Sequence, residues 1–244
     1  MVELRLLGPL QLCVRGAVLP LPIRKTQALL LLLARQGATG RDRLCAWLWP
    51  ALDDTTARRN LRREIARVRE HAGAVLLVAD GDRLRLADGV RVDLAEFSSA
   101  LQDRRPEAAL ALWRGPLADG LRLDDAAPFE DWLARQREQV QSQRRQALEA
   151  AAVMHESAGR LPKALALVTE LLDEDALQEH RHRDAMRLLA ATGRREAALQ
   201  QFERCRQLLK QELGLAPMAE TVALWHSLRT DAGEPARSPA ATAA

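Results

Sequence analysis

Apolar and charged residues alternate along the first few residues of the chain. Val2, Leu4 and Leu6 alternate with Glu3 and Arg5, which is the period-two pattern of a half-buried β-strand. Proline and glycine residues then divide this region into short pieces. The predicted strands cover residues 2–7 and 10–15, and a third extended piece ends at Pro20 and Pro22.

Two helices are predicted next, because the sequence changes to longer apolar runs that end at helix-breaking residues. The first covers residues 25–36 and ends at Gly37. The second covers residues 42–48, and Pro50 lies just beyond it. Together with the strands they indicate a small mixed domain at the start of the chain.

A third helix carries the clearest pattern in this half of the chain. Residues 53–56, Asp-Asp-Thr-Thr, provide an N-cap and an acidic first turn, and the helix is predicted to end at Gly73. Its apolar residues follow the i, i+4, i+7 spacing of one helix face. They are Ala57, Leu61, Ile65, Val68 and Ala72. We expect this face to pack on the core.

Arginine dominates the rest of that helix. Six arginines lie between Arg58 and Arg69, against a single acid, Glu64. A helix that is apolar on one side and arginine-rich on the other can pack on a core and enter the major groove of DNA. The same composition also suits a helix whose charged face is only solvated. The neighbouring elements decide between these two interpretations.

A β-hairpin is predicted directly after the basic helix. Residues 80–82, Asp-Gly-Asp, are a strong turn signal, with Val75 and Leu77 on the strand before it and Arg83 and Arg85 on the strand after it. Strands, two helices, a basic helix and a hairpin, in this order, are typical of a winged helix-turn-helix domain. We therefore favour DNA binding over a merely solvated face.

The predicted DNA contacts lie on the basic helix and on the hairpin. The residues expected to face DNA from the helix are Arg59, Asn60, Arg62, Arg63 and Arg67. Those expected to contact phosphates are Thr56, Arg83 and Arg85. Sequence alone does not separate residues that read bases from residues that position the protein on the DNA backbone.

The second half of the chain is predicted to be helical almost throughout, from about Asp93 onward. Residues 159–165 align with residues 193–199 at an offset of 34, and Val168 aligns with Phe202 at the same offset. Paired helices with a 34-residue period are typical of tetratricopeptide repeats. The sequence therefore predicts an all-α repeat domain here.

An earlier and less regular unit is predicted ahead of this repeat. Residues 106–113 resemble its second helix, and residues 115–116 and 120–128 form an irregular connection. Stacked helix pairs leave a concave surface that commonly holds peptides or partner proteins. The alternative is that the repeats only stiffen the molecule or help it to dimerise. Residues 231–244, rich in alanine, proline and serine, are predicted to be disordered.

Charge is distributed unevenly between the two halves. Residues 1–96 hold 16 basic and 11 acidic residues, whereas residues 97–244 hold 20 and 22. The basic half is therefore the candidate for a polyanionic partner, and partner binding by the acidic half is favoured over DNA contact. Nearly all the cations are arginine, which suits bidentate contacts with phosphate or guanine, although a GC-rich genome also favours arginine.

The sequence contains no convincing catalytic, cofactor-binding or metal-binding pattern. It has no glycine-rich phosphate loop, no nucleophile elbow, no zinc-type spacing of His and Glu, and no tyrosine. His180 and His182 are two residues apart on a predicted helix, so they do not share a face. Cys13, Cys45 and Cys205 share no short spacing, so we expect buried or half-buried thiols. An enzyme and a bound cofactor are therefore not expected.

No segment resembles a membrane span or a secretory signal. The longest apolar run, residues 28–34, is far shorter than the roughly 18–20 residues that a span needs. The N-terminus has neither a basic n-region nor a small-residue cleavage site. We therefore expect a cytoplasmic protein without membrane contact.

Several segments carry a resemblance to a known family over about residues 2–229. In the first half they are residues 4–12 (LRLLGPLQL), residues 24–50 and residues 59–69 (RNLRREIARVR). In the second half they are residues 113–117 (WRGPL), residues 132–137 (WLARQR) and residues 212–221, which begin ELGLAP. Together they resemble the SARP-type family of bacterial regulators, the antibiotic regulatory proteins.

This resemblance implies an OmpR-like winged-helix DNA-binding domain followed by a bacterial transcriptional activation domain. Members bind direct repeats near promoters and recruit RNA polymerase. The implied partners are thus double-stranded promoter DNA, RNA polymerase and a second protomer on the DNA. Some members carry a further C-terminal ATPase or phosphopeptide-binding domain, and neither is expected here. No receiver domain precedes the winged helix, so phosphorylation control is not expected.

The sequence thus predicts a mainly α-helical protein with a small β component. A winged helix-turn-helix domain is predicted over residues 1–92, an all-α tetratricopeptide-like repeat domain over residues 93–230 and a disordered tail over residues 231–244. The predicted function is that of a sequence-specific DNA-binding transcription regulator, and more specifically an activator. The alternatives are a protein-interaction scaffold and a repressor with the same architecture.

Overall fold

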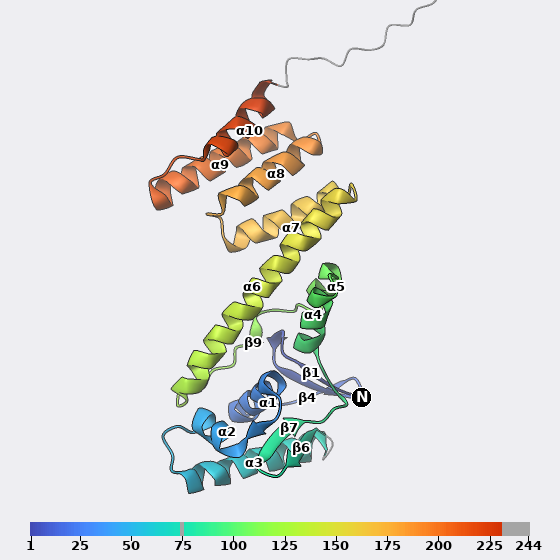
Figure 1. Ribbon diagram of the computed structural model, residues 1–244, viewed down its shortest axis with the longest axis vertical. Helices are drawn as coiled ribbons and strands as arrows, with labels where there is room; N and C mark the ends of the chain where they lie inside the picture. The colour runs from blue at the N-terminus through green and yellow to red at the C-terminus, as the bar shows by residue number, and fades with distance from the viewer. Residues whose placement is uncertain (74–75, 231–244) are drawn as a thin grey trace, which may run out of the picture. The chain divides into compact units, whose positions relative to one another are not determined.

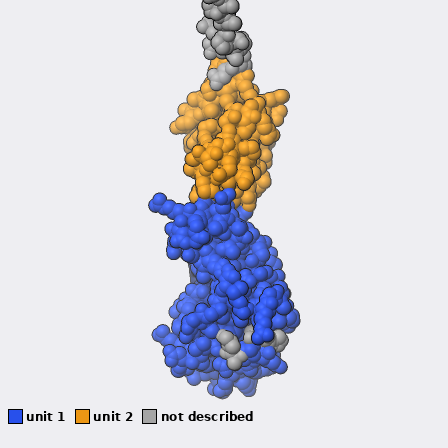
Figure 2. All heavy atoms as spheres, turned by 90° about the vertical axis from the view of Figure 1, so that its right-hand side faces the viewer, with its two compact units in different colours: residues 1–147 blue, residues 148–244 orange. Residues whose placement is uncertain are grey.

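The computed structural model describes residues 1–73 and 76–230, which belong to two compact units. Unit 1 comprises residues 1–147 and unit 2 comprises residues 148–244 (Figure 2). The tail predicted to be disordered, residues 231–244, lies outside the described residues.

A four-stranded sheet opens unit 1. Its strands are β1 (Val2–Arg5), β3 (Gln11–Val14), β4 (Ala17–Leu19) and β8 (Val90–Val92), in the order β4-β3-β1-β8. β1 pairs antiparallel with β3 and parallel with β8. Leu4 and Leu12 lie opposite each other across β1 and β3, and both are fully buried. The two strands predicted from alternation are therefore confirmed in shortened form, and β4 is the third extended piece.

Helix α1 (Arg24–Gln36) is the central helix of unit 1 (Figure 1). Every residue from Ala28 to Leu33 is buried, so apolar side chains surround this helix. It ends at Gly37, whose positive φ of 68° is easily adopted by a residue without a Cβ atom. The helices α2 (Arg41–Leu48) and α3 (Asp54–Ala72) follow, and both contact α1. The predicted order of three helices is confirmed.

The predicted hairpin follows α3 and belongs to a second small sheet. The sheet consists of β5 (Thr39–Gly40), β6 (Leu77–Asp80) and β7 (Arg83–Leu86), in the order β5-β7-β6. It is joined to the start of α2, because the backbone N–H of Arg41 donates to the carbonyl of Asp82 at 3.0 Å. Val75, which the sequence placed on the first hairpin strand, lies outside the described residues.

The segment after β8 continues the same hydrophobic core. Its elements are α4 (Asp93–Gln102), α5 (Pro106–Leu110), β9 (Leu117–Asp119) and α6 (Ala127–Ser157). Leu94, Phe97, Phe129 and Leu133 belong to one cluster of buried residues with the leucines of α1. Trp47 of α2 stacks on Trp132 of α6 with ring centroids 5.4 Å apart. This segment is therefore part of the body that contains the winged helix.

Two details of this segment differ from the prediction. β9 pairs with β2 (Gly8–Pro9), although no strand was predicted after Asp93. A three-residue strand leaves too short a pattern for the sequence to reveal it. Helix α6 begins at Ala127, so Pro128 lies in its first turn and not in the irregular connection. Proline is tolerated there because a first-turn N–H has no partner within the helix.

The carboxylate of Asp93 ties the end of β1 to α4. It is buried and accepts hydrogen bonds from the backbone N–H groups of Leu6 at 2.7 Å and Leu7 at 3.1 Å. Nη2 of Arg114 donates to the same carboxylate at 2.7 Å. The predicted domain boundary after residue 92 falls at this junction, inside unit 1, and stays a prediction.

The described part of unit 2, residues 148–230, contains the end of α6 and four further helices. They are α7 (Leu161–Glu174), α8 (Glu179–Ala191), α9 (Arg195–Leu213) and α10 (Ala219–Thr230). Residues that are 34 positions apart in the repeat occupy equivalent places around α7 and α9. Gly159 and Gly193 have φ values of 71° and 76° in the turns before α7 and α9. Ala164 and Ala198 are both fully buried, where their small side chains allow neighbouring helices to approach closely. The tetratricopeptide-like repeat is thereby confirmed.

A buried histidine joins α8 to its neighbours in unit 2. His182 is 1% exposed, its Nε2 lies 2.9 Å from the carbonyl oxygen of Ala176, and its Nδ1 lies 2.7 Å from Nε2 of Gln201. A neutral ring with its proton on Nε2 satisfies both partners. Burial lowers the pKa of His182 below its ordinary value. His180 is exposed on the same helix, so the two histidines do not share a face, as predicted.

The cysteine thiols and the potential metal ligands among the described residues show no sign of a reactive site. All three cysteines are buried, and burial raises the pKa of the Cys205 thiol to about 11. Within the described residues, no three side chains of His, Cys, Asp or Glu gather as they would around a metal ion. Every helix described is too short or too polar to cross a lipid bilayer.

We predict that Asp93→Ala destabilises the protein by about 3–5 kcal/mol, because it leaves Arg114 and two buried N–H groups without their acceptor. Urea denaturation of the full chain, followed by tryptophan fluorescence, measures the change. The matched control is Asp103→Ala. Asp103 pairs with Arg105 at 2.7 Å on the surface and should contribute less than about 1 kcal/mol. Equal small losses in both variants would contradict this role of Asp93.

A second prediction concerns the pH dependence of unit 2. The pKa of His182 is lower in the folded chain than in the unfolded chain, so unfolding takes up a proton once the pH falls below about 6.5. Stability should therefore decrease between about pH 7.5 and about pH 5.5. Thermal denaturation of His182→Asn should show a weaker dependence over this range, whereas the exposed control His180→Asn should keep that of the parent. Identical profiles for His182→Asn and the parent would rule this out.

Candidate nucleic-acid interface

Helix α3 begins with the predicted side-chain cap. The carboxylate of Asp53 accepts a hydrogen bond from the backbone N–H of Thr56 at 3.0 Å. This hydrogen bond lowers the pKa of Asp53 below its ordinary value. Thr56 is half-buried, and its backbone N–H is engaged by the cap. The start of the helix is therefore anchored one turn ahead of its arginines.

The inner face of α3 is the predicted apolar stripe. Ala57, Leu61, Ile65 and Val68 are all buried in the core of unit 1. Figure 1 shows α3 next to α2 and to strands β6 and β7. The side chain of Ala72, the last predicted member of the stripe, lies outside the described part of the chain. The apolar face is confirmed over three turns.

Glu64, the acid among the six arginines, also lies on this inner face. Glu64 is only 5% exposed. It accepts a hydrogen bond from the hydroxyl of Thr26 on α1 and forms an ion pair with Arg67. A buried carboxylate needs such partners, because an unpaired charge inside a protein is strongly unfavourable. Glu64 therefore links α3 to α1.

The outer face of α3 carries three of the predicted DNA-facing arginines. Arg59, Arg62 and Arg63 are exposed and lie three or four residues apart, on neighbouring positions of one helix face. None of them forms an ion pair with any other described residue of the chain. Their guanidinium groups, each with five N–H donors, are available to an acceptor from outside.

The other two predicted helix residues lie at the edge of this face. Asn60 is half-buried. Arg67 is half-buried as well, and its Nη1 is bound to Oε1 of Glu64. Its guanidinium therefore balances the buried charge of Glu64 within the same helix. A direct contact of Arg67 with DNA stays a prediction.

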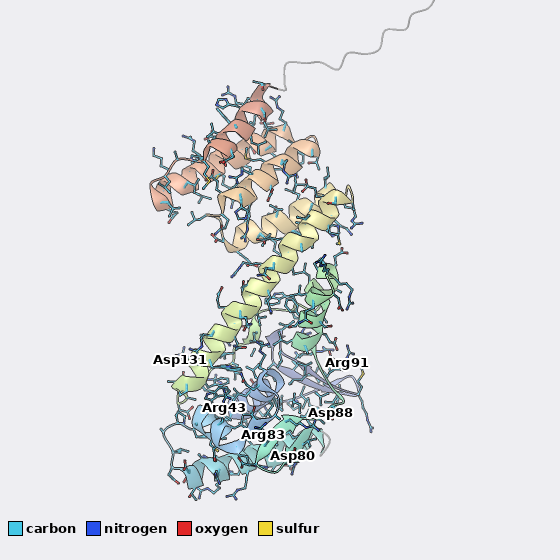
Figure 3. All side chains as sticks on the ribbon, in the orientation of Figure 1. Arg43, Asp80, Arg83, Asp88, Arg91 and Asp131 are labelled. Atoms are coloured by element: carbon cyan, nitrogen blue, oxygen red, sulfur yellow. The ribbon has the colours of Figure 1, made fainter. Side chains whose placement is uncertain are left out.

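The two predicted arginines of the hairpin differ in exposure and in ion pairing. Arg83 is exposed, whereas Arg85 is half-buried and donates to Oδ1 of Asp88 at 2.6 Å. Figure 3 shows Arg83 and Asp80 on the hairpin and Asp88 beside it. Asp82 completes the turn of the hairpin. Acids thus lie close to both hairpin arginines.

The structure adds a groove that sequence reasoning missed. It runs along one flank of α3 and encloses about 650 Å³. Its lining residues are Arg41, Arg58, Leu61, Arg62, Ile65, Ala66 and Arg69. We call it the arginine groove. The spacing of Arg58, Arg62 and Arg69 at i, i+4 and i+11 puts them on one flank of a helix, so this part of the groove could have been inferred. The contribution of Arg41 from α2 required the tertiary structure.

One groove arginine has an acidic partner. Nε and Nη2 of Arg58 donate to Oδ1 of Asp42 at 2.9 and 2.5 Å. These hydrogen bonds raise the pKa of Arg58 above its ordinary value, and the charges of Asp42 and Asp82 add to the effect. Asp42 lies in the first turn of α2, where its charge also suits the positive end of the helix dipole.

A comparison with known families identifies the class of protein. Residues 80–229 match the family model described as the bacterial transcriptional activator domain. This chain belongs to the bacterial transcriptional activator domain family. It is thus a transcription regulator, and the family consists of regulators, not of enzymes.

Two regulators of Mycobacterium tuberculosis are similar to most of the chain. The transcriptional regulatory protein MoaR1 is 27% identical over 251 residues, which cover 93% of this chain and 79% of MoaR1. The transcriptional regulatory protein EmbR is 27% identical over 246 residues, which cover 88% of this chain and 60% of EmbR. The chain therefore spans about three fifths of the length of EmbR. Both relatives are SARP-type regulators, so the predicted family resemblance is confirmed.

A solved structure has the same fold. It is that of Mycobacterium tuberculosis EmbR in complex with a low-affinity phosphopeptide. The TM-score is 0.68 at 25% sequence identity, and the match covers 94% of this chain and 65% of that chain. The predicted fold class, a winged helix-turn-helix domain followed by an all-α repeat domain, is confirmed. The individual DNA contacts predicted on α3 and the hairpin stay predictions.

We predict that Glu64→Ala lowers the free energy of unfolding by about 1–3 kcal/mol, because Thr26 and Arg67 lose a buried acceptor. Chemical denaturation of the full chain measures the change. Glu70→Ala is the matched control, since Glu70 lies on the same helix but is exposed, and it should change stability by less than about 0.5 kcal/mol. A Glu64→Ala protein as stable as Glu70→Ala would show that Glu64 does not anchor α3.

Proposed function

We propose that this chain is a sequence-specific DNA-binding transcription regulator whose winged helix binds double-stranded promoter DNA. The observation that carries the proposal is the difference between the two faces of α3. One face of the helix is buried in the core, and the opposite face presents Arg59, Arg62 and Arg63 to solvent without an ion pair to any described residue. A surface of this kind suits a partner that brings its own negative charge and acceptor atoms.

The dimensions of α3 suit the major groove. The groove of B-DNA is about 12 Å wide and admits one α-helix, which measures about 10–12 Å across with its side chains. An arginine can donate two parallel hydrogen bonds to O6 and N7 of guanine, and this is the commonest specific contact in protein–DNA complexes. Arg59 and Arg63 are one turn apart on the outer face, so we assign base reading to these two.

The hairpin supplies the second contact in this proposal. Arg83 is exposed on β7, and the hairpin sheet is tied to the start of α2 by the Arg41–Asp82 hydrogen bond. A hairpin held in this way can reach the DNA backbone or minor groove beside the site of α3. The acids Asp80 and Asp82 next to it weaken attraction to phosphate, so the hairpin adds less affinity than α3.

We further propose that the chain activates transcription. The family name supports this role, and unit 2 offers stacked helices of the kind that hold partner proteins. The partner that activation requires is RNA polymerase, and binding to direct repeats would place two protomers side by side on the DNA. A regulator of this type acts in the cytoplasm. A repressor would need only occupancy of the promoter, so a reporter assay with the intact operator separates the two roles.

A mobility-shift titration tests the proposed function. The probe is the promoter DNA next to the protein's own gene, at two salt concentrations and with unrelated competitor DNA. A discrete complex that survives the competitor and weakens as salt rises is the expected result. Should no complex form on this promoter or on a pool of random duplexes, the DNA-binding proposal fails. The chain would then be a protein-interaction scaffold.

We predict that Arg63→Ala weakens operator binding by about 1–3 kcal/mol and relaxes the preference for one base pair. The reason is the loss of a bidentate base contact from the outer face of α3. Fluorescence anisotropy with the operator and with single-base variants of it measures both effects. Arg105→Ala removes another exposed arginine, far along the chain from α3, and should leave the affinity unchanged. An unchanged affinity in Arg63→Ala would show that α3 does not read bases through this residue.

A further inference from the structure

The arginine groove has the charge of a binding site for a polyanion. Its seven lining residues, all in the described part of the chain, include four arginines and no acid. Leu61 and Ile65 are buried and form an apolar floor, and Ala66 leaves the middle of the groove open. The charged side chains stand above this floor: Arg58, Arg62 and Arg69 are exposed, and Arg41 is half-buried.

The length of the groove suits a strand of DNA. Arg58 and Arg69 are eleven residues apart, which corresponds to about 16 Å along the helix axis. One DNA strand advances about 3.4 Å per phosphate, so several phosphates fit along this distance. The outer-face residues Arg59 and Arg63 lie on the adjoining side of the same helix. A helix seated in the major groove would therefore bring its flank next to a DNA backbone.

Asp42 forms an ion pair with Arg58, so one of the four groove arginines already has a partner. Both hydrogen bonds from Arg58 go to a single oxygen of Asp42. The two side chains are 53% and 67% exposed, so water and ions reach the pair freely. Exposed ion pairs contribute little to stability, and a phosphate accepts hydrogen bonds from a guanidinium at least as well as a carboxylate does. The pair can therefore be exchanged for a DNA contact.

We propose that the arginine groove binds the phosphodiester backbone of one DNA strand, and that Asp42 is an intramolecular competitor which holds Arg58 until a phosphate replaces it. This inference rests on the proposed function and deepens it, since it names the backbone contact and the residue that limits affinity. Asp42 lowers the affinity for all DNA sequences alike, because phosphate contacts carry no base information. In this way the regulator's attachment to non-specific DNA is kept weak, while base reading by the outer face is unaffected.

The test is a double-mutant cycle on the full chain with Asp42→Asn, Arg58→Ala and the double variant. Fluorescence anisotropy measures binding to an operator duplex and to an unrelated duplex of equal length, across a series of salt concentrations. Asp42→Asn should bind both duplexes about two to five times more tightly, the factor that an exposed ion pair represents. Arg58→Ala should bind both more weakly, with the slope of log affinity against log salt smaller by about one. The double variant should behave like Arg58→Ala.

The matched control is Asp103→Asn. It removes the same charge from another exposed Asp–Arg pair of unit 1, and it should leave the affinity unchanged. Tighter binding by Asp42→Asn that persists without Arg58 would overturn the competition, since it would reflect only the loss of a negative charge. Unchanged binding by Arg58→Ala would overturn the backbone contact. If the parent protein binds neither duplex, the proposed function fails and this inference fails with it. If the parent binds DNA and the variants bind it with the same affinity as the parent, only this inference is overturned.

Discussion

The buried carboxylate of Glu64 is the constraint on which the arrangement of the proposed DNA-facing surface depends. Apolar packing alone leaves a helix some freedom to roll on its core, because hydrophobic contacts are non-directional. Hydrogen bonds are directional, and the one that Thr26 of α1 donates to Glu64 is made at one rotation of α3. At that rotation Arg59 and Arg63 face solvent. One acid on the inner face thus determines which arginines of the helix can reach DNA.

The body that presents this helix is larger than the winged helix alone. Leu94, Phe97 and Phe129 share one hydrophobic cluster with the leucines of α1. Asp93 joins α4 to the end of β1 through two hydrogen bonds and accepts a third from Arg114. A domain of about 90 residues buries a smaller fraction of its surface than one of about 150, so the added segment stabilises the scaffold of the recognition helix. Changes between residues 93 and 147 are therefore expected to act on the proposed DNA-binding surface as well.

Most of the fold could be predicted from the sequence, because local patterns decided it. The stripe of Ala57, Leu61, Ile65 and Val68 and the 34-residue repeat each correspond to the elements observed. Two features depended on contacts between distant residues. They are the pairing of β2 with β9 and the hydrogen bond from Thr26 to Glu64, which lies 38 residues away. The part of the site that could not be predicted is the contribution of Arg41 and Asp42 from α2.

Some of these arginines form an ion pair with a carboxylate of the chain and others do not, and this difference suits them to different contacts with DNA. An arginine that already holds a carboxylate must give up that contact before it binds DNA, so its net gain is small and its contact is easily exchanged. Arg58 with Asp42, and Arg85 with Asp88, are in this state and suit contacts with phosphates that are made and broken along the duplex. Arg59 and Arg63, the proposed base readers, have no ion pair among the described residues, so they would lose none on meeting a base. Acids placed beside the backbone contacts, and absent from the reading face, therefore favour sequence discrimination over attachment to DNA of any sequence.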